Sequence, residues 1–323
     1  TQANYELSTN KTYIYDNSSL NIKFGNVKNE TISILGNYDD EKDKVENYTT
    51  NINYENFINN ENRLYNHIYL RQTIAEYDGS STKQTGYEVD NKMGSFQIGL
   101  ENSNNKNKNN YIAYFNIFDR EYDERGTIDT YKSNTLGLKY DKSKIVSNKV
   151  SYGIGSEYKY DWGQFVNNGS YEASTKGNSD NFTLYSNIGW NVLEDTNFSF
   201  FLRGDKHKHT GINKTFKLNF NQEINNVNFG TSVMSGLRNP TLYEMFGTDN
   251  YGYSGNRNLD PEKSNTYEIY SNLNYNKYLK LSLRAFKSNI KNNIEYISNK
   301  YRNDNDDVDL NQSGLNSEIL ISK

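Results

Sequence analysis

The chain of 323 residues contains no cysteine, only two prolines and only three histidines. The absence of cysteine excludes disulfide bonds, thiolate metal sites and cysteine nucleophiles. No segment approaches the ~20 apolar residues that a transmembrane helix needs. No charged and apolar leader opens the sequence, so we expect no signal peptide in it. No nucleophile motif surrounds the scattered Ser, His and Asp residues, and we therefore expect that the protein is not an enzyme.

The composition is polar but rich in aromatic residues. Hydrophobic residues make up 34% of the chain and the mean hydropathy is -0.97, as in a very polar soluble protein. A transmembrane β-barrel also has such values, because only alternate residues face lipid and the lumen is wet. The 29 tyrosines and 15 phenylalanines suit the aromatic girdles of such barrels. The net charge of -4, without a basic stripe, argues against a nucleic-acid partner.

Several segments alternate between apolar and polar residues, which predicts β-strands with one apolar face. The apolar positions of the clearest segments are Phe216, Leu218 and Phe220; Val227, Phe229, Thr231 and Val233; and Leu279, Leu281, Leu283 and Ala285. This face would look inward in a soluble sandwich and outward to lipid in a barrel. Periodicity alone leaves both alternatives open.

The predicted connections alternate between shorter and longer. Short polar turns are predicted at residues 59–62, 101–110, 141–148, 191–196, 223–226 and 274–277, and longer links at 77–93, 119–133, 161–180, 204–213 and 237–263. Outer-membrane barrels have short periplasmic turns and long extracellular loops. About sixteen strands result, too many for one ordinary open sheet. Only residues 241–246 suggest a helical turn.

Both prolines lie in one long connection, at Pro240 and Pro261, between clear strands. Two short motifs lie in it: Leu237-Arg238-Asn239-Pro240 and Gly255-Asn256-Arg257-Asn258-Leu259, the second followed by Asp260-Pro261-Glu262-Lys263-Ser264. This pair resembles the paired boxes of TonB-dependent outer-membrane receptors. The order of strands and motifs from about Ile34 onward is most similar to that of the cobalamin transporters, although both boxes depart from the usual residues.

The resemblance implies an all-β fold, an antiparallel transmembrane β-barrel of roughly 22 strands with a plugged lumen. The chain would hold about sixteen of these strands as one barrel domain over residues 1–323, incomplete at both ends. The expected location is the cell outer membrane, with its lipid as a partner. Transport would be driven by the TonB complex acting on a plug that this sequence does not contain.

The resemblance implies a bulky, scarce ligand, with cobalamin as the first expectation and a ferric siderophore as the second. A passive porin or a surface adhesin is the alternative from a different class. Haem receptors of this superfamily usually carry a histidine between the two boxes, and residues 241–255 contain none.

Acidic residues gather in two neighbouring predicted outer loops. The first loop contains Asp39, Asp40, Glu41 and Asp43, and the second contains Tyr77, Asp78 and Asp90. Clustered carboxylates suit calcium, and the resemblance to cobalamin transporters, which order their ligand-binding loops with calcium, points to the same cation. The predicted metal ligands are Glu41, Asp43, Tyr77, Asp78 and Asp90. The alternative is that these acids simply solvate the loops.

Aromatic residues of the predicted outer loops form a second candidate site. Amphipathic rings can hold a large ligand through their faces and hydroxyl groups. The candidates are Tyr122, Trp162, Phe165, Tyr243, Phe246, Tyr251 and Tyr253. An interfacial girdle or loop packing is the alternative for each of them.

Two further sets have weaker interpretations. His207 and His209 could bind a metal, but a solvated loop explains them as well. The charged residues Arg203, Lys217, Glu268, Lys280 and Arg284 are expected to face a polar lumen.

Overall fold

The computed structural model describes residues 4–32, 42–77, 86–169, 172–249, 253–276, 278–297, 302–305 and 310–321. The strands are β1 (Asn4–Ile14), β2 (Ser18–Ile32), β3 (Lys42–Phe57), β4 (Asn62–Glu76), β5 (Tyr87–Ser103), β6 (Asn107–Glu124), β7 (Thr127–Ile145), β8 (Val150–Asn167), β9 (Ala173–Leu193), β10 (Thr196–His207), β11 (Gly211–Ile224), β12 (Val227–Arg238), β13 (Glu262–Asn274), β14 (Leu279–Lys291), β15 (Ile294–Ile297), β16 (Arg302–Asn305) and β17 (Leu310–Ile321). One helix, α1 (Leu242–Phe246), lies between β12 and β13.

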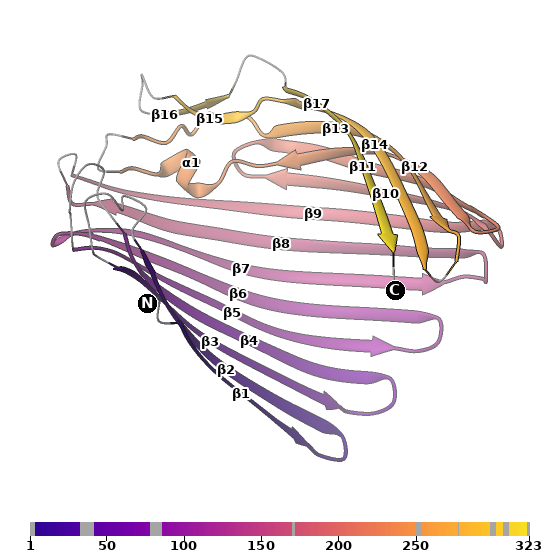
Figure 1. Ribbon diagram of the computed structural model, residues 1–323, viewed down its shortest axis with the longest axis horizontal. Coiled ribbons are helices and arrows are strands. Elements are labelled where there is room, and N and C mark those ends of the chain that lie inside the picture. The colour runs from indigo at the N-terminus through magenta and orange to yellow at the C-terminus, as the bar shows by residue number, and fades with distance from the viewer. Residues whose placement is uncertain are drawn as a thin grey trace.

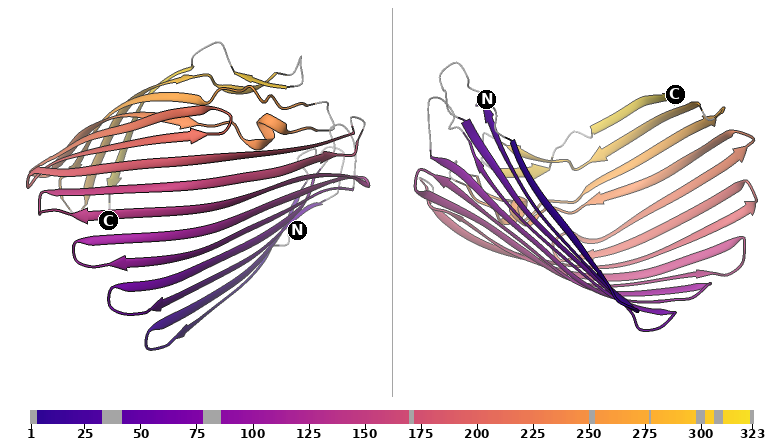
Figure 2. Two further views of the ribbon diagram at one scale, coloured as in Figure 1. Left: turned by 180° about the vertical axis from the view of Figure 1, so that it is seen from behind. Right: turned by 60° about the horizontal axis from the view of Figure 1, so that its bottom comes forward.

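Strands β1 to β14 and β17 form one 15-stranded sheet in which sequence neighbours pair, and every pair is antiparallel. The sheet curls into a trough, with β1 at one edge and β17 at the other (Figures 1 and 2). Strands β15 and β16 form a separate hairpin. The predicted all-β, antiparallel barrel fold is confirmed. Within the described ranges, no helix has the length and hydrophobicity to cross a membrane.

Alternation along the strands gives the sheet two different faces. Large apolar side chains are exposed on the outer face, among them Leu138, Leu184, Leu202, Phe216 and Leu218. Phe220 lies on this face too, and its ring contacts those of Phe198 and Phe229. The predicted outward orientation of Phe216, Leu218 and Phe220 is therefore confirmed. The opposite face, here called the lumen face, carries polar and charged side chains.

Two rows of aromatic rings mark the limits of the apolar band on the outer face. One row runs through Phe96, Phe115, Trp162 and Tyr160, and the other through Trp190, Phe198, Phe220 and Phe229. Trp190 pairs with Val150, twelve residues from Trp162 along β8. With ~3.4 Å per residue and a tilt of about 40°, the rows lie roughly 30 Å apart. This separation matches an outer-membrane barrel.

The strands extend further at one end of the sheet than the sequence predicts. Residues 119–133 are predicted as a long link, but β6 and β7 continue to a two-residue turn. Arg125 (φ 56°) and Gly126 (φ 88°) both have left-handed backbones in this turn, which a tight hairpin requires. The amide of Gly126 donates to Oδ1 of Asp123 at 2.6 Å. Segment 161–180 likewise contains long extensions of β8 and β9, joined by residues 168–172.

Candidate ligand-binding cavity

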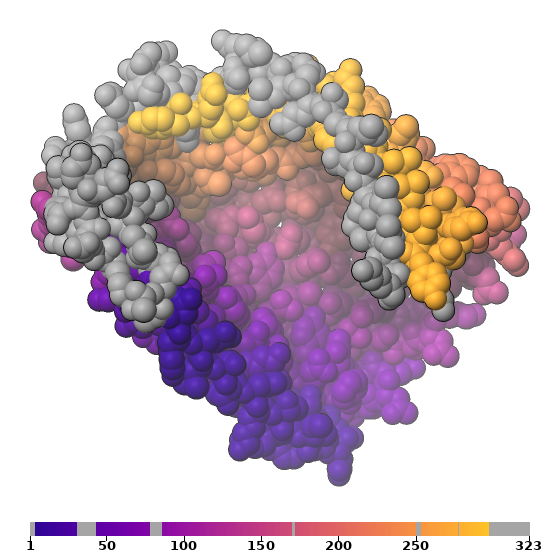
Figure 3. Space-filling model, viewed as in Figure 1, coloured from indigo at the N-terminus to yellow at the C-terminus, as the bar shows by residue number. Residues whose placement is uncertain are grey.

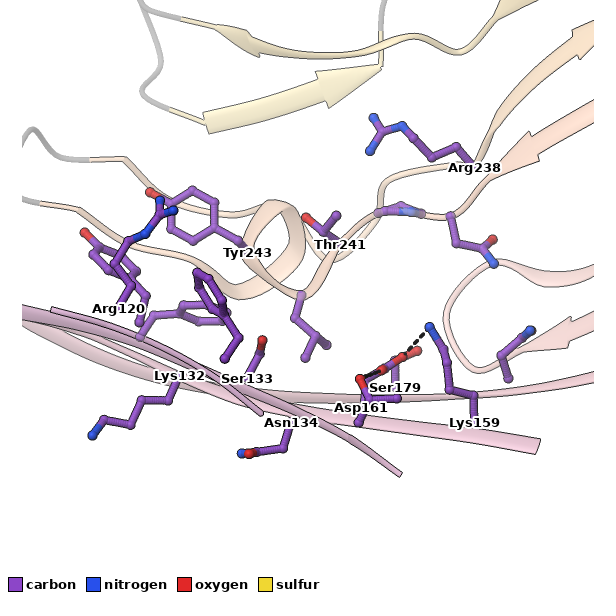
Figure 4. A pocket seen from close by; sticks show the side chains of 18 of the residues that line it. Arg120, Lys132, Ser133, Asn134, Lys159, Asp161, Ser179, Arg238, Thr241 and Tyr243 are labelled. Carbon is purple, nitrogen blue, oxygen red and sulfur yellow. Dashed lines mark hydrogen bonds and ion pairs between the residues drawn. The ribbon is translucent and has the colours of Figure 1, made fainter. Parts of the chain in front are cut away.

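A cavity of about 1030 Å³ lies on the lumen face. Its wall is formed by β6 to β10, and its roof by the end of β12, the following loop and α1 (Figure 4). The space-filling view shows the hollowed lumen face between the first strands and β14 (Figure 3). A cavity of this size suits a bulky ligand, since sites for small molecules span about 300–1,000 Å³.

The roof is held by helix α1, which folds onto the wall instead of extending into solvent. Thr241 caps the helix: its hydroxyl accepts from the amide of Glu244 at 3.1 Å, and Glu244 accepts from the amide of Thr241 at 2.7 Å. Met245 and Phe246 are buried with Phe165 of β8 in the small core of this region. The reciprocal cap and this apolar contact fix the position of so short a helix.

Phe246 fits against β9 because position 177 has no side chain. A Cβ atom at Gly177 would overlap with the Phe246 ring. The hydroxyl of Thr175, two residues earlier on the same face, donates to the carbonyl of Phe246. Glycine in a strand interior often marks such a close approach.

Arg238 joins the roof to the barrel. Its guanidinium binds both carboxylate oxygens of Glu262 at 2.5 and 2.8 Å and both oxygens of Glu244 at 2.9 and 3.0 Å. Glu262 also accepts from the amide of Ile294 at 2.8 Å. The arginine of the first motif and the glutamate after the second therefore connect β12, β13, α1 and the start of β15. Bidentate pairing of this kind is strong and geometrically specific.

Tyrosine rings line one side of the cavity in edge-to-face contact. Tyr243 of α1 meets Tyr131 of β7 at 5.7 Å and Phe165 at 5.5 Å between ring centroids. Tyr122 lies 5.7 Å from Tyr131 and 6.4 Å from Tyr77. Burial raises the pKa of Tyr243 above its ordinary value, and nearby Asp249 raises it further. Tyr243 therefore stays neutral at physiological pH.

Charged side chains occupy the wall below these rings. Lys159 binds Asp161 at 2.9 Å and Arg203 binds Asp205 at 2.8 Å. Asp161 also accepts from the hydroxyl of Thr135 at 2.6 Å. These pairs keep the wall polar and rigid. The lumen-face position of Arg203 agrees with the sequence prediction.

Five of the seven candidate aromatics lie at or next to the cavity. Tyr122, Phe165 and Tyr243 line it, Phe246 packs with Phe165 in the adjoining core, and Tyr253 stacks on Tyr243, with ring centroids 4.9 Å apart. Trp162 lies on the outer face instead, stacked on Phe115 and Tyr160, because it is an even-numbered residue of a strand whose odd-numbered residues face the lumen. Tyr251 lies outside the described residues.

Sequence reasoning missed Tyr131 and Arg120, which both line the cavity. Both lie within the segment that was predicted to be a long link. The alternation could have indicated them, because Arg120 and Tyr131 lie on the same face of β6 and β7 as Tyr122.

The structure does not bring the described members of the predicted calcium site together. Tyr77 lines the cavity. Asp90 lies on the outer face, where it binds Lys92 at 2.9 Å and accepts from the amide of Gln72. Asp43 lies in β3, opposite Thr31. Glu41 and Asp78 lie outside the described residues, as do Asp39 and Asp40. In the described part, no group of three or more His, Asp or Glu residues could hold a metal ion.

The two neighbouring histidines have structural partners. His207 is buried, and its Nε2 lies 2.8 Å from the hydroxyl of Ser179. Its Nδ1 accepts from the amides of His209 and Thr210, both at 3.3 Å. His209 Nε2 lies 2.9 Å from the carbonyl oxygen of Asn178. These contacts cap the β10–β11 turn, so His207 is buried in a tight hairpin and does not belong to the solvated loop that the sequence suggested.

Residues 3–315 match the family described as "TonB dependent receptor-like, beta-barrel". The chain belongs to this family. Its members are transport receptors of the outer membrane, not enzymes. The predicted relationship and location are therefore confirmed, while the narrower prediction of a cobalamin transporter has no support from the comparisons. No curated protein sequence matches the chain.

Several solved structures of receptors and transporters share the fold. The siderophore receptor PirA from Acinetobacter baumannii has a TM-score of 0.76 at 15% identity, covering 97% of this chain and 54% of that one. The outer membrane transporter YddB from Escherichia coli has a TM-score of 0.79 at 10% identity, covering 100% and 52%. The ferric-catecholate import receptor Fiu from E. coli K12 has a TM-score of 0.73 at 13% identity, covering 98% and 61%. This chain thus spans little more than half the length of each.

Proposed function

We propose that this barrel is part of a TonB-dependent active transporter that carries a bulky ferric siderophore across the outer membrane. The observation that supports it most is the cavity of about 1030 Å³ on the lumen face, with tyrosine rings on one side and fixed ion pairs below. Structurally similar receptors are named for siderophores, which favours this ligand class over cobalamin.

In this proposal the chain binds and orients the ligand and does no chemistry on it. The rings of Tyr122, Tyr131 and Tyr243 pack against its apolar surface, and their hydroxyl groups donate hydrogen bonds to it. Helix α1 closes the site from above. Release into the periplasm is driven by the TonB complex acting through a plug, as the family implies.

The proposal is tested with the full-length receptor. Equilibrium binding is measured for a panel of ferric siderophores and for cobalamin, and uptake of radiolabelled iron is measured in cells with and without TonB. We expect one ferric siderophore to bind and its uptake to require TonB. Binding of cobalamin without any ferric siderophore would refute the proposed ligand but not the transporter. TonB-independent uptake would refute the transporter.

Cobalamin is the second candidate, because the stretch from Gly255 to Ser264 resembles that of cobalamin transporters. A calcium site at Glu41, Asp43, Tyr77 and Asp78 is part of the cobalamin alternative and stays a prediction. Calcium should then tighten cobalamin binding, and Asp43→Asn combined with Asp78→Asn should abolish that dependence. A double variant that responds to calcium as the wild type does would contradict it.

A further inference from the structure

The turn between β10 and β11 contacts the roof of the cavity at two points. The hydroxyl of Thr210 donates to Oδ1 of Asn239, at the start of the roof loop, at 2.8 Å. The ring of His209 meets that of Phe246 in α1 edge-to-face, with centroids 5.5 Å apart. One contact holds the beginning of the roof loop and the other holds its helix, so the position of the roof depends on the shape of this turn.

His207 fixes the shape of the turn. It is the last residue of β10, beyond the lipid-facing positions that end at Leu202, and it is buried with 7% exposure. Its Nδ1 accepts from the amides of His209 and Thr210, both at 3.3 Å, so this nitrogen carries no proton. The proton is therefore on Nε2, which donates to the hydroxyl of Ser179 at 2.8 Å. The neutral ring thus ties the turn to β9 and to its own backbone.

The surroundings of His207 disfavour a positive ring. The titratable and charged groups around it are Lys159 and Asp161 of β8, Asp180 of β9, Arg203 and Asp205 of β10, Lys208 and His209 of the turn, and Arg257, which lies over the ring of Phe246. Burial lowers the pKa of His207 below its ordinary value of 6.5, and His209 and Lys159 lower it further, against the opposite effect of the two β8 and β9 carboxylates. The contribution of this ring to stability is therefore complete above pH 6.5 and is lost as the pH falls toward the lowered pKa.

A second proton on His207 would enter at Nδ1, where two amides point. The amides of His209 and Thr210 would lose their acceptor and face a positive ring. The hydroxyl of Thr210, 3.1 Å from Nδ1, can accept this proton, but neither amide regains an acceptor by it. The turn must therefore rearrange, and both of its contacts with the roof are made by residues of the rearranged segment.

We propose that His207 is a positioning residue of the cavity and a pH-sensitive switch: the neutral ring holds the β10–β11 turn, the turn holds Asn239 and α1, and acid releases them. This inference rests on the proposed function only for its consequence, which is weaker ligand binding in acid. The release of the roof is a property of the receptor without its ligand.

The test follows hydrogen exchange of the full-length receptor without ligand. The amides of Met245 and Gly247 report on α1, because they donate to the carbonyls of Thr241 and Tyr243. Their protection factors, corrected for the intrinsic effect of pH on exchange, are measured between about pH 7.5 and about pH 5, the range in which histidine titrates. We expect protection to fall by up to about tenfold per pH unit below pH 6.5 and to level off below the lowered pKa of His207.

His207→Asn separates the titration from the fold. An asparagine oxygen can accept from amides two and three positions on, as it does in turns, but it does not titrate. This variant should keep α1 protected throughout the pH series. His207→Phe has no acceptor and should lose at neutral pH the protection that the wild type loses only in acid. His67→Asn is the matched control, because His67 lies on β4, apart from the cavity, with its Nδ1 2.6 Å from Oδ1 of Asn53; it should respond to pH as the wild type does.

Thr210→Val tests the link to the roof by a second route. It removes the hydroxyl that reaches Asn239, so it should lower the protection of α1 at neutral pH, and unchanged protection would overturn the link. A wild-type α1 whose protection does not change with pH, or a His207→Asn variant that loses protection in acid as the wild type does, would overturn the switch. These outcomes do not depend on which complex binds, so a failure of the proposed siderophore function is distinguishable from a failure of the switch.

Discussion

The guanidinium of Arg238 holds the carboxylate of Glu262 through two hydrogen bonds of 2.5 and 2.8 Å. These residues are 24 positions apart and directly paired across β12 and β13. The second carboxylate on the same guanidinium, Glu244, belongs to the helix between them. The roof of the cavity is thus fastened at the point where its loop leaves and re-enters the sheet. This contact gives a physical reason for the arginine of the first motif and for the glutamate that follows the second.

Replacing Arg238 should release the roof without unfolding the barrel. In Arg238→Gln both carboxylates lose their cation, and we expect the local opening of residues 239–261 to become easier by about 1–2 kcal/mol, given that the pair is partly exposed. Limited proteolysis should then cut this loop faster. Arg284→Gln is the control, since its pair with Glu268 is longer, at 3.7 Å, and more exposed. Equal cleavage of both variants and wild type would contradict the role of Arg238.

The absence of a side chain at Gly177 should be necessary for α1 to dock. Gly177→Val places methyl groups where the Phe246 ring lies, so the ring must leave its site. We expect a loss of ligand affinity of at least tenfold, measured by equilibrium binding. Gly204→Ala is the control, because a Cβ there meets no atom within 4 Å. A valine variant that binds as the wild type does would show that α1 docks in another way.

A second close approach should support the barrel wall itself. The ring of Tyr114 lies over Gly137 on the neighbouring strand, where a Cβ would overlap with it. Gly137→Ala should therefore destabilise the folded barrel by about 1–3 kcal/mol. In a Tyr114→Ala background, Gly137→Ala should lower the free energy of unfolding much less, because the ring that its Cβ would meet is gone. The measurement is a double-mutant cycle of urea unfolding in detergent. Additive effects of the two substitutions would contradict a direct contact.

Two aromatic residues on opposite sides of the sheet, Tyr243 of α1 and Trp162 of β8, should respond differently to replacement. Tyr243→Ala should weaken ligand binding at least tenfold, because its ring lines the cavity. Trp162→Ala should leave ligand affinity unchanged, since its ring lies among Phe115 and Tyr160 on the outer face. In a Trp190→Phe background, which removes the other outer-face tryptophan of this chain, brominated lipids should quench the fluorescence of Trp162 in membranes. Loss of ligand affinity in the Trp162 variant, with no quenching of Trp162 in that background, would place the ring in the lumen.

The sequence predicts the membrane-spanning strands well and their outer ends poorly. Phe216, Leu218 and Phe220 alternate with polar residues because lipid covers one face and water the other. Beyond the membrane, water covers both faces and the alternation disappears. Asp119 and Arg120 lie on opposite faces of β6 and are both charged. The sequence pattern therefore predicts a loop at this end of the strand. The predicted link 161–180 begins at Asp161, so it also includes Trp162, which lies at the limit of the apolar band.

The cavity could be predicted only in part. The sequence places Tyr243 in the loop between the two motifs, and Tyr243 does line the cavity. The residues that cap its helix, Thr241 and Glu244, are neighbours in the sequence. Tyr131 and Arg120 come from distant strands, and their meeting with α1 depends on the register of the sheet and on the fit of Phe246 against Gly177. A single sequence does not specify such long-range pairings.

The central claim is that a ferric siderophore binds on the lumen face beneath α1. The most direct measurement is a structure of the full-length receptor with the bound ferric complex, in which anomalous scattering locates the iron. The account predicts one iron peak within the cavity, beside the rings of Tyr122 and Tyr243. An iron peak elsewhere on the receptor, with this cavity filled only by water, would contradict it.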